Sequence, residues 1–333
     1  MDYIKEAPEI LREFLVYHET IKGHSKKTTD EYFLDLRTMF RFLKQQKGLV
    51  PRGTEFEDIP IDDVDLEFVR NITLSDIYGY LAYLARDREK NSRSVRPGHG
   101  LTATSRARKV ATIRSYFKYL TVKTKQLEKN PVADLDSPKT AKTLPRYLSL
   151  DESTQLLSAV DGSHKERDYC IITLFLNCGL RISELAGLDL TDIHADSLRV
   201  FGKGGKERIV YLNDACAEAI NDYLKLRRDI KALDSRALFL SSRKTRITKS
   251  TIHHLVKTHL ASAGLDASKY SSHKLRHTAA TLLLRNGVDV RTLQELLGHE
   301  HLNTTQIYTH VENDSLREAA ALSPLSKIKK KEK

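Results

Sequence analysis

The chain has 333 residues, which is longer than most single domains, so its length predicts two domains of roughly 100 to 200 residues each. Hydrophobic residues make up 40% of it and charged residues 30%, as in globular proteins, and the sequence holds no apolar run of about 18 residues that would cross a bilayer. Its first residues also lack the basic-then-apolar pattern of a signal peptide. We therefore expect a cytoplasmic protein with no membrane partner.

The charge and the cysteines narrow the class further. Fifty-five lysines and arginines against 44 acidic residues give a net charge of +11 and a pI near 9.4. Such a charge is typical of proteins that meet phosphates, although basic surfaces also bind membranes or serve solubility. The three cysteines, Cys170, Cys178 and Cys216, show no C-x-x-C spacing, which argues against a disulfide framework and a zinc knuckle. They are predicted to be reduced residues in helix cores.

Two helices are predicted in the first 45 residues. A helical apolar face runs from Ile10 to Ile21. Thr28 with Glu31 forms a capping box ahead of a second apolar face, which runs from Tyr32 to Leu43. A polar stretch that contains proline follows, from Gln45 to Asn71.

A third helix is predicted to begin at a capping box of Thr73 and Asp76, and a fourth runs from about Thr104 to Val122 after a glycine-rich loop. One side of the fourth helix is apolar. Basic side chains occupy the rest of its surface: Arg106, Arg108, Lys109, Arg114 and Lys118. A solvated charged face and a contact with DNA would both explain these residues, so the helix alone decides neither.

A polar stretch with three prolines, residues 123–145, is predicted to hold an interdomain linker. Ser149 with Glu152 then caps a new helix. A strongly apolar helix from Asp168 to Cys178, which Gly179 ends, is expected to form the core of a second domain. The predicted parts are a helical domain at 1–125, a linker at 126–145, a second domain at 146–326 and a basic tail at 327–333.

A short β-hairpin is predicted in the second domain. Two apolar runs, at 198–201 and 208–212, flank the sequence GKGGKE, whose glycines fit a turn between strands. They do not fit a nucleotide-binding loop, because such a loop leads into a helix. Lys203 at the tip is either a solvated turn residue or a side chain that reaches into a groove. Helices are predicted after the hairpin at 214–231, 249–263, 272–286, 289–297 and 303–308.

Arg181 is the first residue that could do chemistry. It follows Gly179, which lets the chain turn, and it begins a new helix. A buried arginine needs an anion, and either a structural ion pair with Glu184 or Asp189 or a bound ligand would provide one.

Histidines and a tyrosine in the last third of the chain are further candidates. His273 and Arg276 lie on one face of a helix start, where exposed amides also favour an anion. His273 and His277 are spaced like zinc ligands, but the glutamate of H-E-x-x-H and a nearby cysteine are both missing, so no metal is predicted. His299 follows a helix-ending glycine, and Tyr308 comes nine residues later. Alone, each is more often structural than functional.

Together, six residues in chain order supply every group that a phosphodiester transfer needs. They are Arg181, Lys203, His273, Arg276, His299 and Tyr308. Two arginines can hold the non-bridging oxygens of a phosphate, and Lys203 can deliver a proton to the departing oxygen. Tyr308 can attack the phosphorus, and its ester conserves the bond energy, so strands can be rejoined without ATP or another cofactor.

The motifs around these residues resemble the tyrosine recombinases, and within them the bacterial Xer group that resolves chromosome dimers. The resemblance covers nearly the whole chain. It is carried by GLRISEL, GKGGKER, HKLRHTAATLLLRNG and LGHEHLNTTQIYTHV, and by the linker NPVADLDSPK before LPRYLS. One departure is the segment 48–71, which is longer than in the shortest Xer proteins.

The resemblance implies a mainly α fold with a small β-sheet. An N-terminal helical core-binding domain, which is SAM-like, and a C-terminal mixed α/β catalytic domain are expected to form a clamp on duplex DNA. In that setting, the basic fourth helix is expected to contact DNA through the five residues named above.

The resemblance also implies a role for each of the six residues. Arg181 and Arg276 would clamp the scissile phosphate, and His299 would add a hydrogen bond to it. Lys203 would be the general acid for the 5′-hydroxyl, and His273 would assist proton transfer at the nucleophile. Tyr308 would form a 3′-phosphotyrosyl link to DNA. Neither a metal nor a cofactor is expected.

By the same resemblance, four protomers would bind two duplex sites, each a dif-like inverted repeat, and exchange strands through a Holliday junction. The assembly is expected to be a homotetramer or a heterotetramer with a second recombinase, with a septal DNA translocase as a further partner. Residues after Tyr308 could form an amphipathic helix that docks onto a neighbour or packs in its own subunit. Three alternatives stay open: an integrase of a phage or conjugative element, a type IB topoisomerase, and a DNA-binding protein without catalysis.

Overall fold

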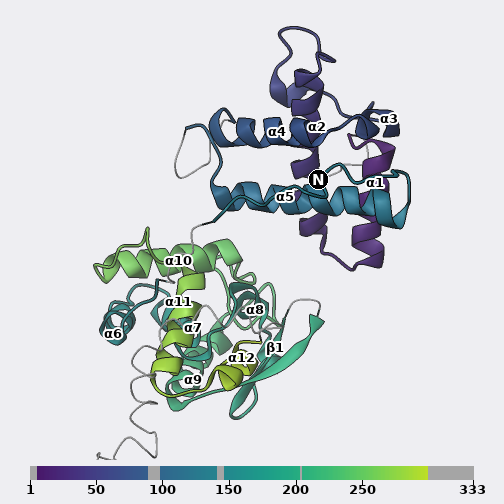
Figure 1. Cartoon of the computed structure of the whole chain (residues 1–333). Helices are drawn as coiled ribbons and strands as arrows, with labels where there is room; N and C mark the ends of the chain where they lie inside the picture. Colours follow the sequence, from purple (N-terminus) through teal and green to yellow (C-terminus); the bar gives the residue numbers. More distant parts are fainter. Residues whose placement is uncertain (1–5, 89–97, 141–145, 203–204, 299–333) are drawn as a thin grey trace, which may run out of the picture. The chain divides into compact units, whose positions relative to one another are not determined.

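The computed structural model describes residues 6–88, 98–140, 146–202 and 205–298. The chain divides into two compact units, residues 1–142 and 143–333, and each has its own hydrophobic core (Figure 1). Both units are built mainly from helices, and the described residues hold one two-stranded sheet. This confirms the predicted mainly α fold with a small sheet.

The N-terminal unit is helical throughout its regular elements. Its helices are α1 (Glu9–Val16), α2 (Lys26–Gln46), α3 (Leu66–Arg70), α4 (Leu74–Arg86) and α5 (Ala103–Lys118). The predicted capping box of Thr73 and Asp76 begins α4. The predicted cap at Thr28 is wrong, because Ser25 lies in the extended conformation and its side chain accepts the N–H of Thr28. The helix α2 therefore starts earlier than the apolar pattern indicated.

Helices α4 and α5 both pack on the long helix α2 (Figure 1). Aromatic side chains fill the space between them, among them the fully buried Phe40, Tyr80 and Tyr116. The chain after α5 adds to the same core, because Leu127 and Leu135 are buried there. The predicted linker thus begins with residues that pack in the N-terminal unit.

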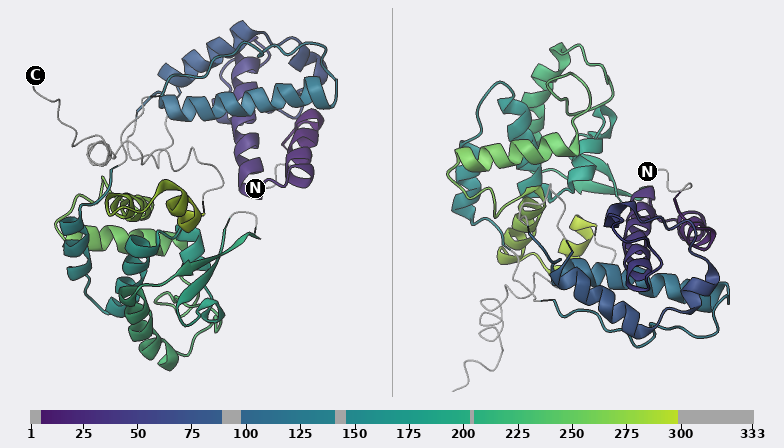
Figure 2. Two further views of the ribbon diagram at one scale, coloured as in Figure 1. Left: turned by 60° about the horizontal axis from the view of Figure 1, so that its bottom comes forward. Right: turned by 90° about the horizontal axis from the view of Figure 1, so that it is seen from above.

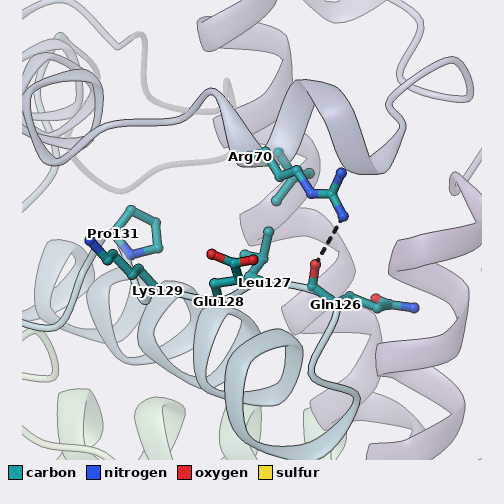
Figure 3. A pocket seen from close by; sticks show the side chains of 7 residues that line it. Arg70, Gln126, Leu127, Glu128, Lys129 and Pro131 are labelled. Carbon is teal, nitrogen blue, oxygen red and sulfur yellow. Dashed lines mark hydrogen bonds between the residues drawn. The ribbon is translucent and has the colours of Figure 1, made fainter.

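A shallow open pocket of about 600 Å³ lies where α3 meets the chain that follows α5 (Figure 3). An Nη of Arg70 donates to the backbone carbonyl of Gln126 across a distance of 3.4 Å. Leu127 and Pro131 also line the pocket. The contact fastens the end of the helical unit to α3.

The buried His18 connects the π-helical segment that follows α1, Tyr17–Ile21, to α5. His18 is 7% exposed, its Nδ1 lies 3.3 Å from Nδ1 of His24, and its Nε2 lies 3.2 Å from Oγ of Ser115. Burial lowers the pKa of His18 to about 4, and the positive charges of His24 and Lys22 act in the same direction. The folded chain therefore keeps this ring neutral at a pH where the unfolded chain protonates it.

We expect the N-terminal unit to lose stability as the pH falls from 6.5 to 4, because only the unfolded state takes up a proton on His18 in that window. Above pH 6.5 the contribution is complete. Partial solvent screening limits it to about 1 to 2 kcal/mol. His18→Phe should flatten the dependence of Tm on pH, whereas the same change at the exposed His254 on a helix of the other unit should not. Equal slopes for the wild type and His18→Phe would contradict this account.

The C-terminal unit surrounds a central helix, α7 (Lys165–Cys178), which packs against α9 (Asp214–Asp229) and α11 (Ser272–Arg285). The other helices of the unit are α6 (Leu150–Ser158), α8 (Ile182–Gly187), α10 (Lys249–Ser262) and α12 (Val290–Leu297). The predicted capping box of Ser149 and Glu152 begins α6. The predicted helix at 303–308 lies outside the described residues.

The predicted hairpin is formed by β1 (Ser197–Phe201) and β2 (Glu207–Tyr211), which pair antiparallel at the edge of this unit (Figure 2). Val200 lies opposite Arg208 in the register. The three cysteines are buried and free, as predicted. Within the described part of the chain, every helix is too short or too polar to span a membrane.

Candidate active site

Three of the six predicted catalytic residues lie in the described part of the chain: Arg181, His273 and Arg276. Lys203, His299 and Tyr308 lie outside it. The three described residues come from the start of α8 and the first turns of α11, and the structure brings them to one place. The two arginines share the carboxylate of Glu184 as a partner, and His273 lies close enough to both for their charges to act on it.

Arg181 is the N-cap residue of α8 and is held at both ends. Its backbone N–H donates to Oε2 of Glu184 at 2.7 Å, and its Nη1 donates to Oε1 at 2.7 Å. Its Nη2 donates to the carbonyl of Gly298 at 2.8 Å. The ion pair with Glu184 that the sequence allowed is therefore present, whereas Asp189 pairs with Arg246. The side chain of Arg181 remains 34% exposed, so its guanidinium can also meet an anion from solvent.

Arg276 is buried beneath this point. Its Nη1 donates to the carbonyl of Gly179 and its Nη2 to that of Leu297, each at 2.6 Å. Its Nη1 also lies 3.9 Å from Oε2 of Glu184. Two backbone carbonyls thus fix the plane of the guanidinium, which is the pre-organisation that bidentate phosphate binding requires.

Gly179 makes this arrangement possible. It has a left-handed conformation with φ of +58°, and a Cβ at this position would lie 2.7 Å from Cδ2 of Leu297. A residue other than glycine would therefore be strained by this conformation, and its Cβ would displace the side chain of Leu297. The close approach brings the carbonyl groups of Gly179 and Leu297 to the same guanidinium.

Glu184 is the residue whose importance the sequence did not reveal. Its side chain is fully buried, and it accepts hydrogen bonds from Arg181 and from Arg208 on β2. Burial alone would raise its pKa, but the hydrogen bonds from Arg208 and from the backbone of Arg181 outweigh burial and hold the pKa below its usual value. The carboxylate therefore stays charged. The only signal in the sequence was its place three residues after Arg181.

His273 lies on the exposed side of the first turn of α11. Although the residue as a whole is exposed, partial burial of its ring lowers its pKa, and the nearby charges of Arg276, Lys274 and Arg181 lower the pKa further. A neutral ring at pH 7 can accept a proton, as the predicted role requires. Its ring centroid lies 4.6 Å from that of His277, but the described residues contain no cluster of three or more side chains that could hold a metal ion.

The five basic residues predicted to contact DNA differ in their surroundings. Lys109 on α5 is buried, and its Nζ lies 2.7 Å from Oδ1 of Asp35 on α2. Arg108 also pairs with Asp35 at 2.8 Å, but it is 47% exposed. Arg106 and Arg114 donate to backbone carbonyls of Leu101 and Leu135, and Lys118 is exposed.

Three guanidinium groups around one buried carboxylate leave an excess of positive charge at this point of the C-terminal unit. The carboxylate of Glu184 balances the charge of one guanidinium group and orients the arginine side chains that contact it. The excess positive charge and the partly exposed guanidinium of Arg181 are what an anion such as a phosphodiester would require.

Comparison with known proteins assigns the chain to a family. Residues 146–314 match the model of the Phage integrase family. The chain is 51% identical to the tyrosine recombinase XerC of Caldanaerobacter subterraneus subsp. tengcongensis over 96% of this chain and 88% of the relative. It is 36% identical to the tyrosine recombinase XerD of Proteus mirabilis over 92% of this chain and 90% of the relative.

Solved structures of relatives share the fold. The XerH site-specific recombinase in a pre-cleavage complex with its difH substrate has a TM-score of 0.64 at 21% identity, covering 94% of this chain and 84% of XerH. A lambda integrase tetramer bound to a Holliday junction has a TM-score of 0.58 at 17% identity, covering 90% of this chain and 76% of the integrase. The chain belongs to the Phage integrase family. Within that family it is a tyrosine recombinase of the Xer group, a site-specific recombinase, as its motifs predicted.

Proposed function

We propose that this recombinase cuts and rejoins duplex DNA through a 3′-phosphotyrosyl intermediate at Tyr308 and that it resolves chromosome dimers. One observation carries the proposal: Arg181 and Arg276 both lie beside the carboxylate of Glu184. They do so within the part of the chain that matches the Phage integrase family. Arg181 and Arg276 hold the two non-bridging oxygens of the scissile phosphate. His299 donates a further hydrogen bond to the same phosphate.

The reaction is a transesterification. The phenolic oxygen of Tyr308 attacks the phosphorus, and the bond to the 5′-oxygen of the next nucleotide breaks. His273 receives the phenolic proton, and Lys203 gives a proton to the departing oxygen. The reverse step, with a 5′-hydroxyl of another strand, rejoins the DNA. Because the ester bond energy is kept, rejoining needs no nucleotide, and Arg181 and Arg276 supply the positive charge that a metal ion would otherwise supply.

The proposed substrate is a pair of dif-like inverted repeats, which four protomers bind. The four protomers are either all copies of this chain or a mixture of this chain and a second recombinase. A Holliday junction forms after the first pair of strands is exchanged and before the second. The names of the XerC and XerD relatives support the assignment, and so do the XerH complex with difH and the lambda integrase tetramer on a junction. We also propose that both units clamp the duplex and that a septal DNA translocase activates the complex. The segment after Tyr308, which lies outside the described residues, is proposed to dock onto a neighbouring protomer.

The proposed contact of α5 with DNA gives a separate prediction. Lys118→Gln should weaken binding uniformly across sequences and reduce the slope of log Kd against log salt by about 1, because one exposed phosphate contact is lost. Lys109→Gln should instead lower Tm, because Asp35 keeps its burial and loses one cation. Fluorescence anisotropy between roughly 50 and 200 mM salt measures the first effect. An unchanged slope in Lys118→Gln would remove this residue from the interface.

A supercoiled plasmid with two directly repeated chromosomal inverted repeats tests the proposed function. We expect two smaller circles, each carrying one repeat. Relaxation of the plasmid without exchange would instead indicate a topoisomerase. Binding without any cleavage, even when the second recombinase and the translocase are added, would indicate a non-catalytic DNA-binding protein. Exchange at the ends of a mobile element, but not at the chromosomal repeat, would indicate an integrase.

A further inference from the structure

Arg208 is a second arginine on the carboxylate that holds Arg181. It lies on β2, and its Nη1 and Nη2 donate to Oε1 and Oε2 of Glu184 at 2.6 and 3.0 Å. Its Nε donates to the carbonyl of Leu296 on α12 at 3.3 Å. The side chain is 15% exposed and that of Glu184 is fully buried, so the pair is largely removed from solvent. One guanidinium therefore joins β2, α8 and α12.

The contact with α12 is close as well as polar. Gly298 caps α12 with φ of +62°, and a Cβ on it would lie 2.9 Å from Cδ of Arg208. The carbonyl of the same glycine accepts the hydrogen bond from Arg181. Arg208 and Arg181 thus share both a carboxylate and the end of α12 as contacts.

Arg208 is close in the sequence to Lys203, and its contact on α12 is close in the sequence to His299; both residues belong to the proposed catalytic set. Lys203 precedes Arg208 by five residues, and His299 follows Gly298 directly. Arg208 is anchored on β2, which follows Lys203 in the chain, and on the end of α12, which precedes His299. Fixing both points limits the positions from which the chain can present them.

We propose that Arg208 is a positioning residue of the recombinase, which sets the orientation of Arg181 and the separation of the hairpin from α12 through Glu184 and the cap at Gly298. The inference rests on the proposed function, since it concerns the same phosphate site. Without Arg208, Glu184 keeps its contacts with the backbone and guanidinium of Arg181 and loses its bidentate partner, which leaves Arg276 at 3.9 Å as the other nearby cation. The guanidinium of Arg181 is then drawn toward the carboxylate and away from the phosphate.

The test compares Arg208→Met and Arg208→Lys with a matched control, Arg199→Met. Arg199 lies on the neighbouring strand β1 and also binds a buried carboxylate, Asp192, at 3.0 Å. Single-turnover cleavage of a nicked suicide substrate, Kd for the same DNA and Tm are measured for each. We expect cleavage to fall about 100-fold in Arg208→Met with Kd within about twofold, about 10-fold in Arg208→Lys, and less than about threefold in the control.

A second measurement does not depend on activity. In Arg208→Met, amide hydrogen exchange should accelerate in residues 181–187 and 293–298, because both segments lose a common anchor. Arg199→Met should leave these two segments unchanged. If the wild-type protein traps DNA but Arg208→Met cleaves as fast as the control, the inference about Arg208 is wrong. If exchange accelerates as expected but the wild-type protein traps no DNA, the proposed function is wrong and the structural junction stands.

Discussion

Tyr308→Phe is expected to abolish covalent trapping of a nicked suicide substrate while the Kd for that DNA stays within about twofold of the wild type. Phenylalanine has no hydroxyl to attack the phosphorus, and the change leaves the size of the side chain almost the same. Trapping is measured as a protein–DNA band that resists denaturation.

Tyr211→Phe is the matched control, because this tyrosine lies on β2 in the same unit and is 76% exposed. The Tyr211→Phe variant also loses one phenolic hydroxyl, but at a residue outside the proposed catalytic set, and it should trap DNA at the wild-type rate. A Tyr308→Phe protein that still forms the adduct would show that another residue is the nucleophile.

Arg276→Lys is expected to lower the cleavage rate by about 100- to 1,000-fold with little change in Kd. Lysine keeps the positive charge, but a single ammonium cannot reach both the Gly179 and Leu297 carbonyls and also bind an oxygen of the phosphate in a fixed plane. Binding changes little because the scissile phosphate is one of many phosphates that the protein contacts.

Arg285→Lys on the same helix provides the control. Arg285 is exposed, and its guanidinium lies over the ring of Tyr147 at 5.2 Å. It should cleave within about twofold of the wild type. Tm is measured for both variants, and a loss of cleavage in Arg276→Lys that only follows a loss of folded protein would contradict the catalytic role.

Local rules predicted the fold where the governing contacts are local. The capping boxes at Thr73 and Ser149 were confirmed because all their partners lie within three residues. The same rule was wrong at Thr28, since Ser25 supplied an earlier cap. The packing of Leu127 in the N-terminal core could not be predicted, because it depends on contacts with helices far away in sequence.

In the candidate site, too, the sequence motifs predicted which residues matter but not which atoms they contact. The identities of Arg181 and Arg276 came from their motifs, but their backbone acceptors did not. The carbonyl of Gly298 lies 117 residues from Arg181 in the chain, and only the turn at Gly179 and the cap of α12 bring the two together. Glu184 looked like one half of an ordinary ion pair, and its second arginine came from a different element.

The basic residues of α5 include both a structural lysine and a lysine that can reach a phosphate, and the amino-acid composition does not distinguish the two. Lys109 and Lys118 both belong to the polar side of the helical pattern. Yet Lys109 is paired with the buried Asp35, whereas Lys118 is exposed. A buried acidic partner on another helix leaves no local signal, so only the three-dimensional packing distinguishes a structural lysine from one that can reach a phosphate.

The central claim is that Tyr308 carries the DNA during exchange. Its most direct test is protease digestion of the trapped wild-type complex, followed by mass spectrometry of the peptide that bears nucleotides. We expect a phosphodiester between the phenolic oxygen of Tyr308 and the 3′ end of the cleaved strand. Nucleotides on any other residue, or a link to a 5′ end, would contradict it.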